Sequence, residues 1–249
     1  MAPPVVAVPV SLARPLADPP PADVVTARVD ALRHRIEDAG RDPGAVRIVA
    51  VTKGFTAGAV EAARAAGLYD IGENYADEFL AKVRSLSSAR EGASDGVESS
   101  PPTRWHYLGA IQRRRVPKLA PVVSWWQTVC RASEGESIAA RAAGATVLVE
   151  VETTSIPGRN GCAPSEVPEL VATLRRDGLD VRGLMTVGPP GPPEESRRSF
   201  RVTAELAREL GLRELSMGMT DDLEVALSEG STMLRVGRAL FGERPRQPR

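Results

Sequence analysis

The chain has 249 residues, a length that suits one large domain, and a single barrel of eight β/α units takes roughly 250 residues. Its 32 basic and 32 acidic residues balance, which removes the strong positive field expected of a nucleic-acid binder. Two cysteines and two histidines are too few for a disulfide framework or a zinc cluster. No apolar run approaches the roughly 20 residues that span a bilayer, so we expect a cytoplasmic protein.

The first ordered element is expected to be a helix that begins near residue 23. Residues 1–22 are rich in proline and have no basic segment before their apolar run, which predicts a disordered tail rather than a signal peptide. Asp23 is a suitable N-cap, Val25 and Val29 begin an apolar face, and Gly40 ends the pattern.

Beyond this helix, short apolar runs alternate with amphipathic stretches. The predicted strands are Arg47–Thr52, Tyr69–Gly72, Trp105–Leu108, Trp125–Val129, Thr146–Val151, Val181–Thr186, Glu214–Ser216 and Met233–Val236. The helical patterns between them include Ala59–Ala66, Ala76–Ser85, Glu134–Ala143, Val167–Arg176, Glu194–Leu210 and Asp221–Glu229. This alternation predicts parallel strands with right-handed crossovers. Because the strands are mostly apolar throughout, we expect a single α/β domain, a (β/α)8 TIM-type barrel with an extra N-terminal helix; an open doubly wound sheet is the alternative.

Two segments do not fit the barrel pattern. Residues 87–103 are small and polar and end in prolines, so they predict a mobile insert. Pro189–Pro193 predicts a stiff loop after the sixth strand, and residues 245–249 predict a frayed C-terminus. The barrel domain is therefore expected to span residues 23–244.

Active-site residues of such barrels lie where the strands end at their carboxyl side. The candidates at these positions are Lys53, Asn74, His106, Met185, Ser216, Met217, Gly218, Arg235 and Gly237. This set is more polar than packing requires.

Phosphate binding in these barrels commonly uses the loops after strands seven and eight. Ser216 offers a hydroxyl, Gly218 allows backbone N–H groups to come close, and Gly237 opens a short helical turn whose N–H groups favour an anion. Either glycine alone is more typical of a tight turn, but the two together at the expected strand ends favour a phosphate site.

Lys53 directly follows the first strand. Most lysines in such a position are solvated surface charges, but a single amine facing a phosphate site across the barrel suits a phosphorylated aldehyde. Imine formation needs a deprotonated amine, and burial with a nearby cation such as Arg235 would lower the lysine pKa. His106 can stack on an aromatic ligand or serve as a core histidine, and Asn74 can bind a ligand hydroxyl or cap the following helix.

Five segments together carry a family resemblance: VAVTKGF, IGENYADE, WHYLGAIQ, RGLMTVG and LSMGMTDDLEVALSEGSTMLRVGRALFGER. They resemble the pyridoxal phosphate homeostasis protein family, PLP-binding barrel proteins related to the N-terminal domain of alanine racemase. The resemblance covers roughly residues 23–244, and the last segment is long and highly specific.

The resemblance implies a role for each of several residues. Lys53 would hold pyridoxal 5′-phosphate (PLP) as a Schiff base, and Arg235 would face the pyridine nitrogen. Asn74 would line the pocket, and Ser216 with the backbone around Gly237 and Arg238 would bind the phosphate. The chain departs from the family pattern at Arg114, Arg115, Glu152 and Arg238, where Asn, Lys, Asn and Thr are more usual.

The resemblance favours a PLP carrier in vitamin B6 homeostasis, with no established catalytic activity. Arginine has only donors, so Arg235 must face an unprotonated nitrogen, which weakens the electron sink. A weak amino-acid racemase or lyase is the enzymatic alternative, with His106 as its acid/base group. Alanine racemases add a C-terminal domain and a partner's tyrosine, and we expect neither here because only eight residues follow Phe241. A barrel that binds another phosphorylated metabolite non-covalently is the third possibility. We expect a monomer, with PLP-dependent apo-enzymes as recipients of the cofactor.

Overall fold

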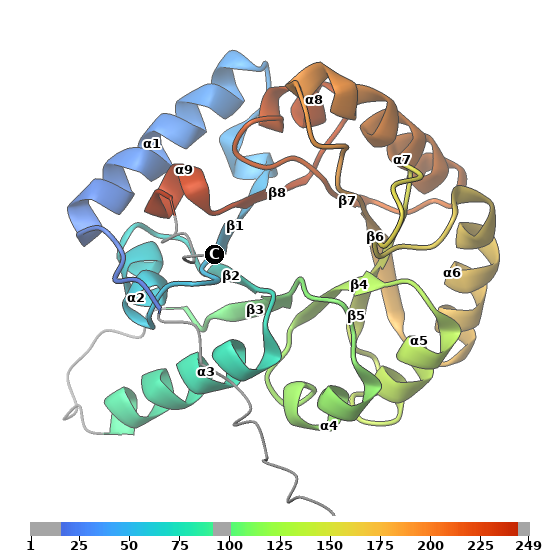
Figure 1. The fold of residues 1–249 in the computed structure, drawn as a ribbon, viewed down its shortest axis with the longest axis horizontal. Helices are drawn as coiled ribbons and strands as arrows, with labels where there is room; N and C mark the ends of the chain where they lie inside the picture. Colours follow the sequence, from blue (N-terminus) through green and yellow to red (C-terminus); the bar gives the residue numbers. More distant parts are fainter. Residues whose placement is uncertain (1–15, 92–100, 244–249) are drawn as a thin grey trace, which may run out of the picture.

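Eight parallel strands form one closed barrel in the computed structural model, which describes residues 16–91 and 101–243 (Figure 1). The strands are β1 (Arg47–Val51), β2 (Asp70–Glu73), β3 (Arg104–Tyr107), β4 (Trp125–Val129), β5 (Thr146–Glu150), β6 (Asp180–Met185), β7 (Glu214–Ser216) and β8 (Met233–Val236). They are paired in chain order, and β1 closes the barrel against β8, from Arg47 opposite Met233 to Ala50 opposite Val236. The predicted TIM-type barrel is therefore confirmed.

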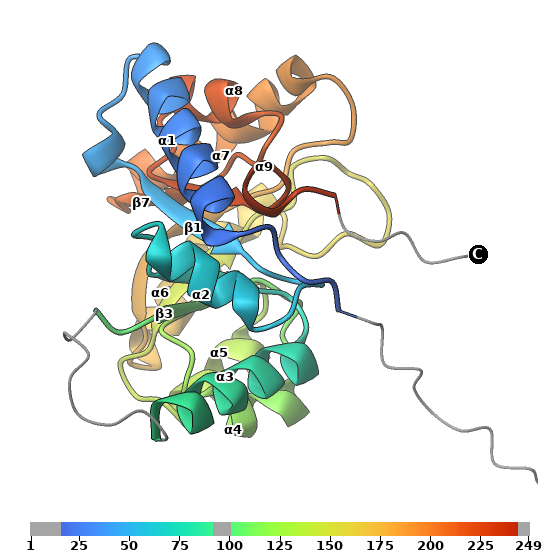
Figure 2. The ribbon, with the colours of Figure 1, turned by 90° about the vertical axis from the view of Figure 1, so that its left-hand side faces the viewer.

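Helices surround the barrel and cover its outer surface (Figure 1). They are α1 (Ala22–Asp38), α2 (Gly58–Ala65), α3 (Ala76–Glu91), α4 (Val116–Leu119), α5 (Ala132–Ala139), α6 (Val167–Arg176), α7 (Arg197–Glu209), α8 (Leu223–Ser228) and α9 (Arg238–Phe241). The extra helix α1 packs against α2, α8 and α9 beside the closure of the barrel. Figure 2 shows α9 and the loop after β5 projecting from the same end of the barrel. None of the helices in residues 16–91 and 101–243 is long and apolar enough to cross a bilayer.

Two apolar clusters lie on opposite faces of the strands. The larger cluster fills the space between strands and helices; α1, for example, contributes Val25, Val29, Leu32 and Ile36, four residues at helical spacing. The smaller cluster contains Val49, Trp125, Leu148, Met185 and Met233, which sit at alternate strand positions and fill part of the barrel interior. The rest of the interior is polar, and this polar part leads to the site described below.

Some boundaries differ from those expected. Helix α3 continues to Glu91, so residues 87–91 of the predicted insert are helical, and residues 92–100 lie outside the described residues. The N-cap of α1 is Pro21, and Asp23 lies in the first turn instead. Most of the predicted tail, like residues 245–249, also lies outside the described residues. Residues 16–22 of the tail are described, and among them Ala17 N–H donates to the Gly54 oxygen at 3.0 Å while its oxygen accepts from Thr56 N–H at 2.8 Å.

Candidate functional site

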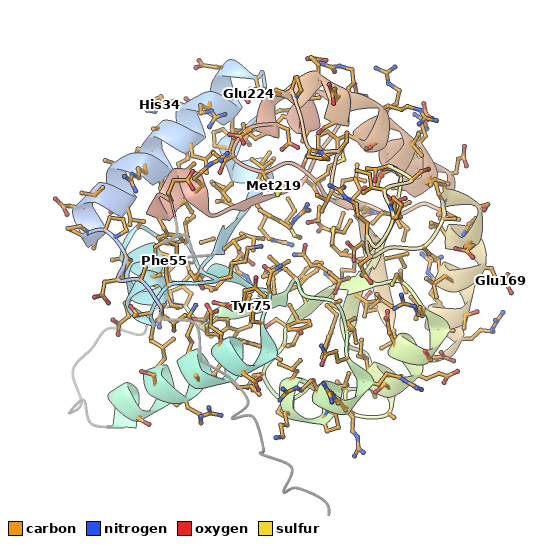
Figure 3. All side chains as sticks on the ribbon, in the orientation of Figure 1. His34, Phe55, Tyr75, Glu169, Met219 and Glu224 are labelled. Atoms are coloured by element: carbon orange, nitrogen blue, oxygen red, sulfur yellow. The ribbon has the colours of Figure 1, made fainter. Side chains whose placement is uncertain are left out.

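A cavity of about 700 Å³ opens at the carboxyl end of the barrel. The loops that follow the strands supply its lining, as expected for a TIM barrel. Of the predicted residues, the lining contains Lys53, Asn74, Met185, Arg235, Gly237 and Arg238. In Figure 3, Phe55 and Tyr75 lie on the β1–β2 side of the barrel, and Met219 lies toward β7 and β8. The cavity therefore brings together the ends of β1, β2, β6 and β8.

Lys53 follows β1, and a buried lysine on α3 fixes the backbone just before it. The Lys82 side chain is only 2% exposed, and its Nζ donates to the Thr52 carbonyl oxygen at 2.7 Å. The same Nζ donates to Glu73 Oε1 at 2.5 Å and to Glu78 Oε1 at 2.8 Å. Lys82 therefore links the end of β1 to the end of β2 and to the first turn of α3.

The two carboxylates bonded by Lys82 hold the residues on both sides of Lys53. Glu73 Oε1 accepts a hydrogen bond from the Thr52 hydroxyl at 2.5 Å, and Glu78 Oε1 accepts one from Gly54 N–H at 2.5 Å. Burial raises the pKa of Glu73 to about 6, although Lys82 and the Thr52 hydroxyl oppose that rise. Sequence reasoning missed this network; the signal was the i, i+4 pair of Glu78 and Lys82 on a predicted helix.

Arg235 forms the inner wall of the cavity, and its guanidinium is bonded to neutral acceptors. Nη1 donates to the Ser216 carbonyl oxygen at 2.5 Å and to Ser216 Oγ at 2.8 Å, and Nη2 donates to the Thr186 carbonyl oxygen at 2.8 Å. Burial lowers the pKa of Arg235 to about 10, against the opposing charges of Asp222 and Glu150. These bonds use three of the five N–H donors and fix the orientation of a group that stays charged at neutral pH.

A chain of buried hydrogen bonds runs from Arg235 down through the barrel. The Ser216 hydroxyl accepts from Arg235 and donates to Gln127 Oε1 at 2.6 Å. Gln127 Nε2 donates to His106 Nδ1 at 2.7 Å, and His106 Nε2 then donates to Asp70 Oδ1 at 2.9 Å. Burial lowers the pKa of His106 despite the nearby Asp70 carboxylate, which keeps the imidazole neutral.

Four predicted site residues lie elsewhere. His106 is fully buried, stacks on Trp125, and is absent from the cavity lining, as is Ser216, whose hydroxyl is used within the chain just described. Met217 packs in the shell between strands and helices. Gly218 has φ +92°, and a Cβ there would lie 2.5 Å from Ala226 Cβ, so this glycine serves the turn and the packing of α8.

The lining next to β7 comes from the following residues of the same loop, which sequence reasoning overlooked: Met219, Thr220, Asp221 and Asp222. Thr220 Oγ1 accepts a hydrogen bond from Ala239 N–H at 3.2 Å in the first turn of α9. The polar run T-D-D after the glycine was the available signal. Next to β7, the cavity is therefore lined by the loop rather than by the end of the strand.

The start of α9 comes close to the end of β1. A Cβ at Gly237 would lie 3.1 Å from the Val51 carbonyl oxygen, so a glycine permits this approach. The Arg238 side chain is about half exposed and is ion-paired with Asp221 at the cavity mouth. This basic group at the mouth therefore already has an acidic partner.

Asn74 contributes an acceptor that has no partner within the described part of the chain. Its Nδ2 donates to the Leu108 carbonyl oxygen at 3.3 Å, whereas its Oδ1 is buried without a hydrogen bond. A buried oxygen in that state is costly unless a donor reaches it. The lining thus offers an amine, a guanidinium and an amide oxygen to one ligand. The described residues contain no cluster of three or more His, Cys, Asp or Glu side chains fit for a metal ion.

Fold and cavity together define an α/β barrel protein with a ligand site at the carboxyl ends of its strands. The family model described as "Alanine racemase, N-terminal domain" matches residues 28–245. A pyridoxal phosphate homeostasis protein from Pseudomonas aeruginosa is 36% identical over 223 residues, covering 86% of this chain and 91% of that protein. The protein of the same name from Escherichia coli K12 is 31% identical and covers 82% of this chain and 88% of its own length. The chain therefore belongs to the alanine racemase N-terminal domain family and, within it, to the pyridoxal phosphate homeostasis proteins.

Solved structures agree with this membership. An unknown protein from Bifidobacterium adolescentis has a TM-score of 0.77 at 35% identity, with 88% of this chain and 95% of that one covered. PipY of Synechococcus elongatus with PLP bound has a TM-score of 0.72 at 28% identity, with 88% and 100% covered. The shared fold extends over nearly all of the barrel.

Proposed function

We propose that this chain binds pyridoxal 5′-phosphate in the carboxyl-end cavity, held as a Schiff base on Lys53, and acts in intracellular PLP homeostasis. The observation that carries the proposal is the convergence of Lys53, Arg235 and the unpartnered Asn74 Oδ1 on one cavity of about 700 Å³. The names of the relatives and the PLP in the PipY structure support the same ligand.

The lining residues fit the groups of PLP. Lys53 offers the amine, and Arg235 offers only donors, which suit an unprotonated pyridine nitrogen. Asn74 Oδ1 can accept a hydrogen bond from the ring hydroxyl. The phosphate would be held by the N–H groups at the start of α9, around Gly237 and Arg238, with Thr220 beside them. Bound PLP supplies an electrophilic aldehyde carbon and an electron-accepting ring.

A carrier role is favoured over a racemase or lyase. An acid/base group opposite Lys53 would be needed for proton transfer to an amino acid. His106 was the sequence-level candidate, and it is buried in the hydrogen-bond chain below the cavity. The ionisable lining residues other than Lys53 and the two arginines are four carboxylic acids, and each already has a partner: Glu150 with Asn160, Asp222 with Ser196 and Met219 N–H, and both Asp221 and Glu243 with Arg238. We therefore propose that the protein binds and releases PLP.

The proposal extends to the setting in which the protein works. PLP-dependent apo-enzymes would be the recipients of the released cofactor. A monomer is sufficient because the lining described above comes from one chain. Cys130 and Cys162 are both free thiols, which suits a reducing cytoplasm.

An absorption spectrum with and without borohydride tests the proposal. We expect the purified protein, supplied with PLP, to show a visible band that borohydride bleaches, with the reduced adduct on the peptide that contains Lys53. Lys53→Ala is expected to lack the band, whereas Lys118→Ala, which removes an exposed lysine, is expected to keep it. A band of full strength in Lys53→Ala would refute the attachment site, and a wild-type protein that takes up no PLP would refute the cofactor.

A further inference from the structure

A second cavity, of about 450 Å³, lies at the opposite end of the barrel. Its lining includes the first residues of four strands: Arg47 of β1, Asp70 of β2, Arg104 of β3 and Glu214 of β7. We call it the amino-end pocket. The proposed PLP site uses none of its residues.

Basic side chains outnumber acidic ones in the amino-end pocket. The charged lining residues are Arg33, Arg47, Arg104 and Arg213 against Asp70 and Glu214, an excess of two positive charges. The acidic groups are also engaged. Asp70 accepts hydrogen bonds from Arg104 at 2.8 and 2.5 Å, and Glu214 accepts one from the Thr232 hydroxyl at 3.0 Å. The unneutralised charge therefore resides on arginines.

Arg47 has a donor without an acceptor. Its Nη1 is buried and makes no hydrogen bond within the described part of the chain. The nearest carboxylate oxygens lie 3.8 Å from its Nε, on Asp70, and 3.9 Å from its Nη1, on Glu214, which are ion-pair rather than hydrogen-bond distances. The guanidinium lies 4.7 Å above the Trp125 ring, which fixes its plane. The guanidinium of Arg47 is thus held in place while its Nη1 has no hydrogen-bond acceptor among the described residues.

Arg213 is another arginine of the amino-end pocket. It is exposed, and its side chain makes no hydrogen bond or ion pair with any residue in 16–91 or 101–243. Buried donors in native proteins nearly always have an acceptor, and guanidinium groups match the oxygens of a phosphate especially well. One tetrahedral anion would supply the acceptor that the buried Arg47 Nη1 lacks, and the exposed Arg213 is free of competing carboxylates among the described residues.

We propose that the amino-end pocket binds a small phosphate-bearing anion through Arg47 and Arg213. Arg33 and Arg104 would add to the attractive potential without giving up their own partners. The ligand can be free phosphate or the phosphate of a small ester, because both present the same oxygens to the two guanidinium groups. The proposal does not depend on PLP binding at the other end.

Calorimetric titration of the full-length protein with inorganic phosphate, at constant ionic strength in chloride, tests this site. The protein is first saturated with PLP and reduced, so that the carboxyl-end cavity is filled. We expect one phosphate per chain, and about tenfold or greater weakening in both Arg47→Met and Arg213→Ala. Glycerol 3-phosphate in place of phosphate distinguishes an ester ligand from the free ion.

Two controls separate this site from general attraction and from the other cavity. Arg208→Ala removes an exposed arginine near the end of α7, outside the pocket, and is expected to leave phosphate affinity unchanged. Prior saturation with PLP, followed by reduction, is the second control, because phosphate cannot then bind in the filled carboxyl-end cavity. The proposal would be overturned if Arg213→Ala bound phosphate with the heat and affinity of the wild type. It would also be overturned if the wild type showed no binding heat with phosphate up to the millimolar range. Because Arg213 is exposed, its variant still tests the site even if Arg47→Met fails to fold.

Discussion

The two ends of the barrel use arginine in different ways. At the carboxyl end, Arg235 is buried and bonded to two carbonyl oxygens and a hydroxyl, so its charge is oriented but not cancelled by a hydrogen-bonded carboxylate. At the amino end, Arg104 is half exposed and forms a two-pronged pair with Asp70. Neutral acceptors hold a cation ready for a ligand, whereas a carboxylate partner largely neutralises it. This contrast separates a binding arginine from a structural one.

The two ends of the barrel also differ in the charged group around which their hydrogen bonds are organised. Behind Lys53 the fixing group is the buried ammonium of Lys82, which serves three acceptors at once. At the amino end, Asp70 serves as the common acceptor for Arg104 and His106. The chain through Gln127 and Ser216 joins that carboxylate to Arg235. Each of the following changes tests one part of this arrangement.

Lys82→Met is expected to have the largest effect. It removes the cation that Glu73 and Glu78 share, and it leaves the Glu73 carboxylate fully buried and that of Glu78 largely buried. Loss of one partner of a buried ion pair typically costs about 3–5 kcal/mol of unfolding free energy. Urea unfolding measures it, with the exposed Lys118→Met as the control. A loss below about 1 kcal/mol would show that the network does not fix the Lys53 segment.

Gln127→Leu is expected to cause the second-largest loss of unfolding free energy. It interrupts the hydrogen-bond chain and leaves the Ser216 hydroxyl and His106 Nδ1 without their partner. Each unsatisfied buried group costs about 1–3 kcal/mol. The same variant should make the position of the Arg235 side chain less fixed, so we expect faster release of bound PLP. The release rate is measured from the decay of the PLP absorbance after dilution. Unchanged release together with reduced stability would confine Gln127 to a structural role.

The pH dependence of stability is expected to have opposite signs at the two ends. Burial raises the pKa of Glu73 to about 6 from an ordinary value of 4.5, so the folded state retains a proton that the unfolded state releases. Its contribution is full below pH 4.5 and is lost as the pH rises through about 6, an effect of roughly 1–2 kcal/mol. Glu73→Gln should remove this loss from a series of urea midpoints across that range.

Asp70 provides the matched comparison at the amino end. Burial would raise its pKa, but the hydrogen bonds from Arg104 and His106 outweigh burial and hold the pKa well below its usual range. Its contribution is therefore present above pH 3.8 and is lost as the pH falls. In Asp70→Asn, the urea midpoint should therefore depend less on pH on the acid side of the profile, and the rest of the profile should be unchanged. If both variants changed the same limb, the assigned directions would be wrong.

Arg238→Ala is expected to change stability least. Its pair with Asp221 is solvent-exposed on both sides, and exposed pairs contribute about 0–1 kcal/mol. The unfolding midpoint should therefore barely move, while PLP affinity should fall if the start of α9 binds phosphate. A large stability change would instead indicate that the Asp221 pair helps hold the cavity mouth together.

The barrel was predictable from the sequence because each strand is a short apolar run between clear helical patterns. The bounds of β4, β7 and β8 match the prediction, and a polar residue directly precedes each of these strands. Helix α3 ran on past Ser85 because its polar continuation still suits an exposed helical turn, and apolar periodicity cannot mark where such a turn stops.

The site was predictable only in part. Lys53, Asn74 and Arg235 are found by locating strand ends, which is a local property of the sequence. Whether a side chain at a strand end faces the cavity or the interior depends on its register in the closed barrel, and for this reason Ser216 and His106 lie outside the cavity lining. Gln127 lies 89 residues from Ser216, a pairing that no local pattern reveals.

The bridge between Ala17 and the segment after β1 has a practical consequence. Its two hydrogen bonds go to Gly54 and Thr56, which follow Lys53 within three residues. This pairing with Ala17 therefore restrains the segment that presents the amine. Removal of the chain through residue 17, by a protease or by design, would delete no residue of the eight strands, but it would remove both of these hydrogen bonds.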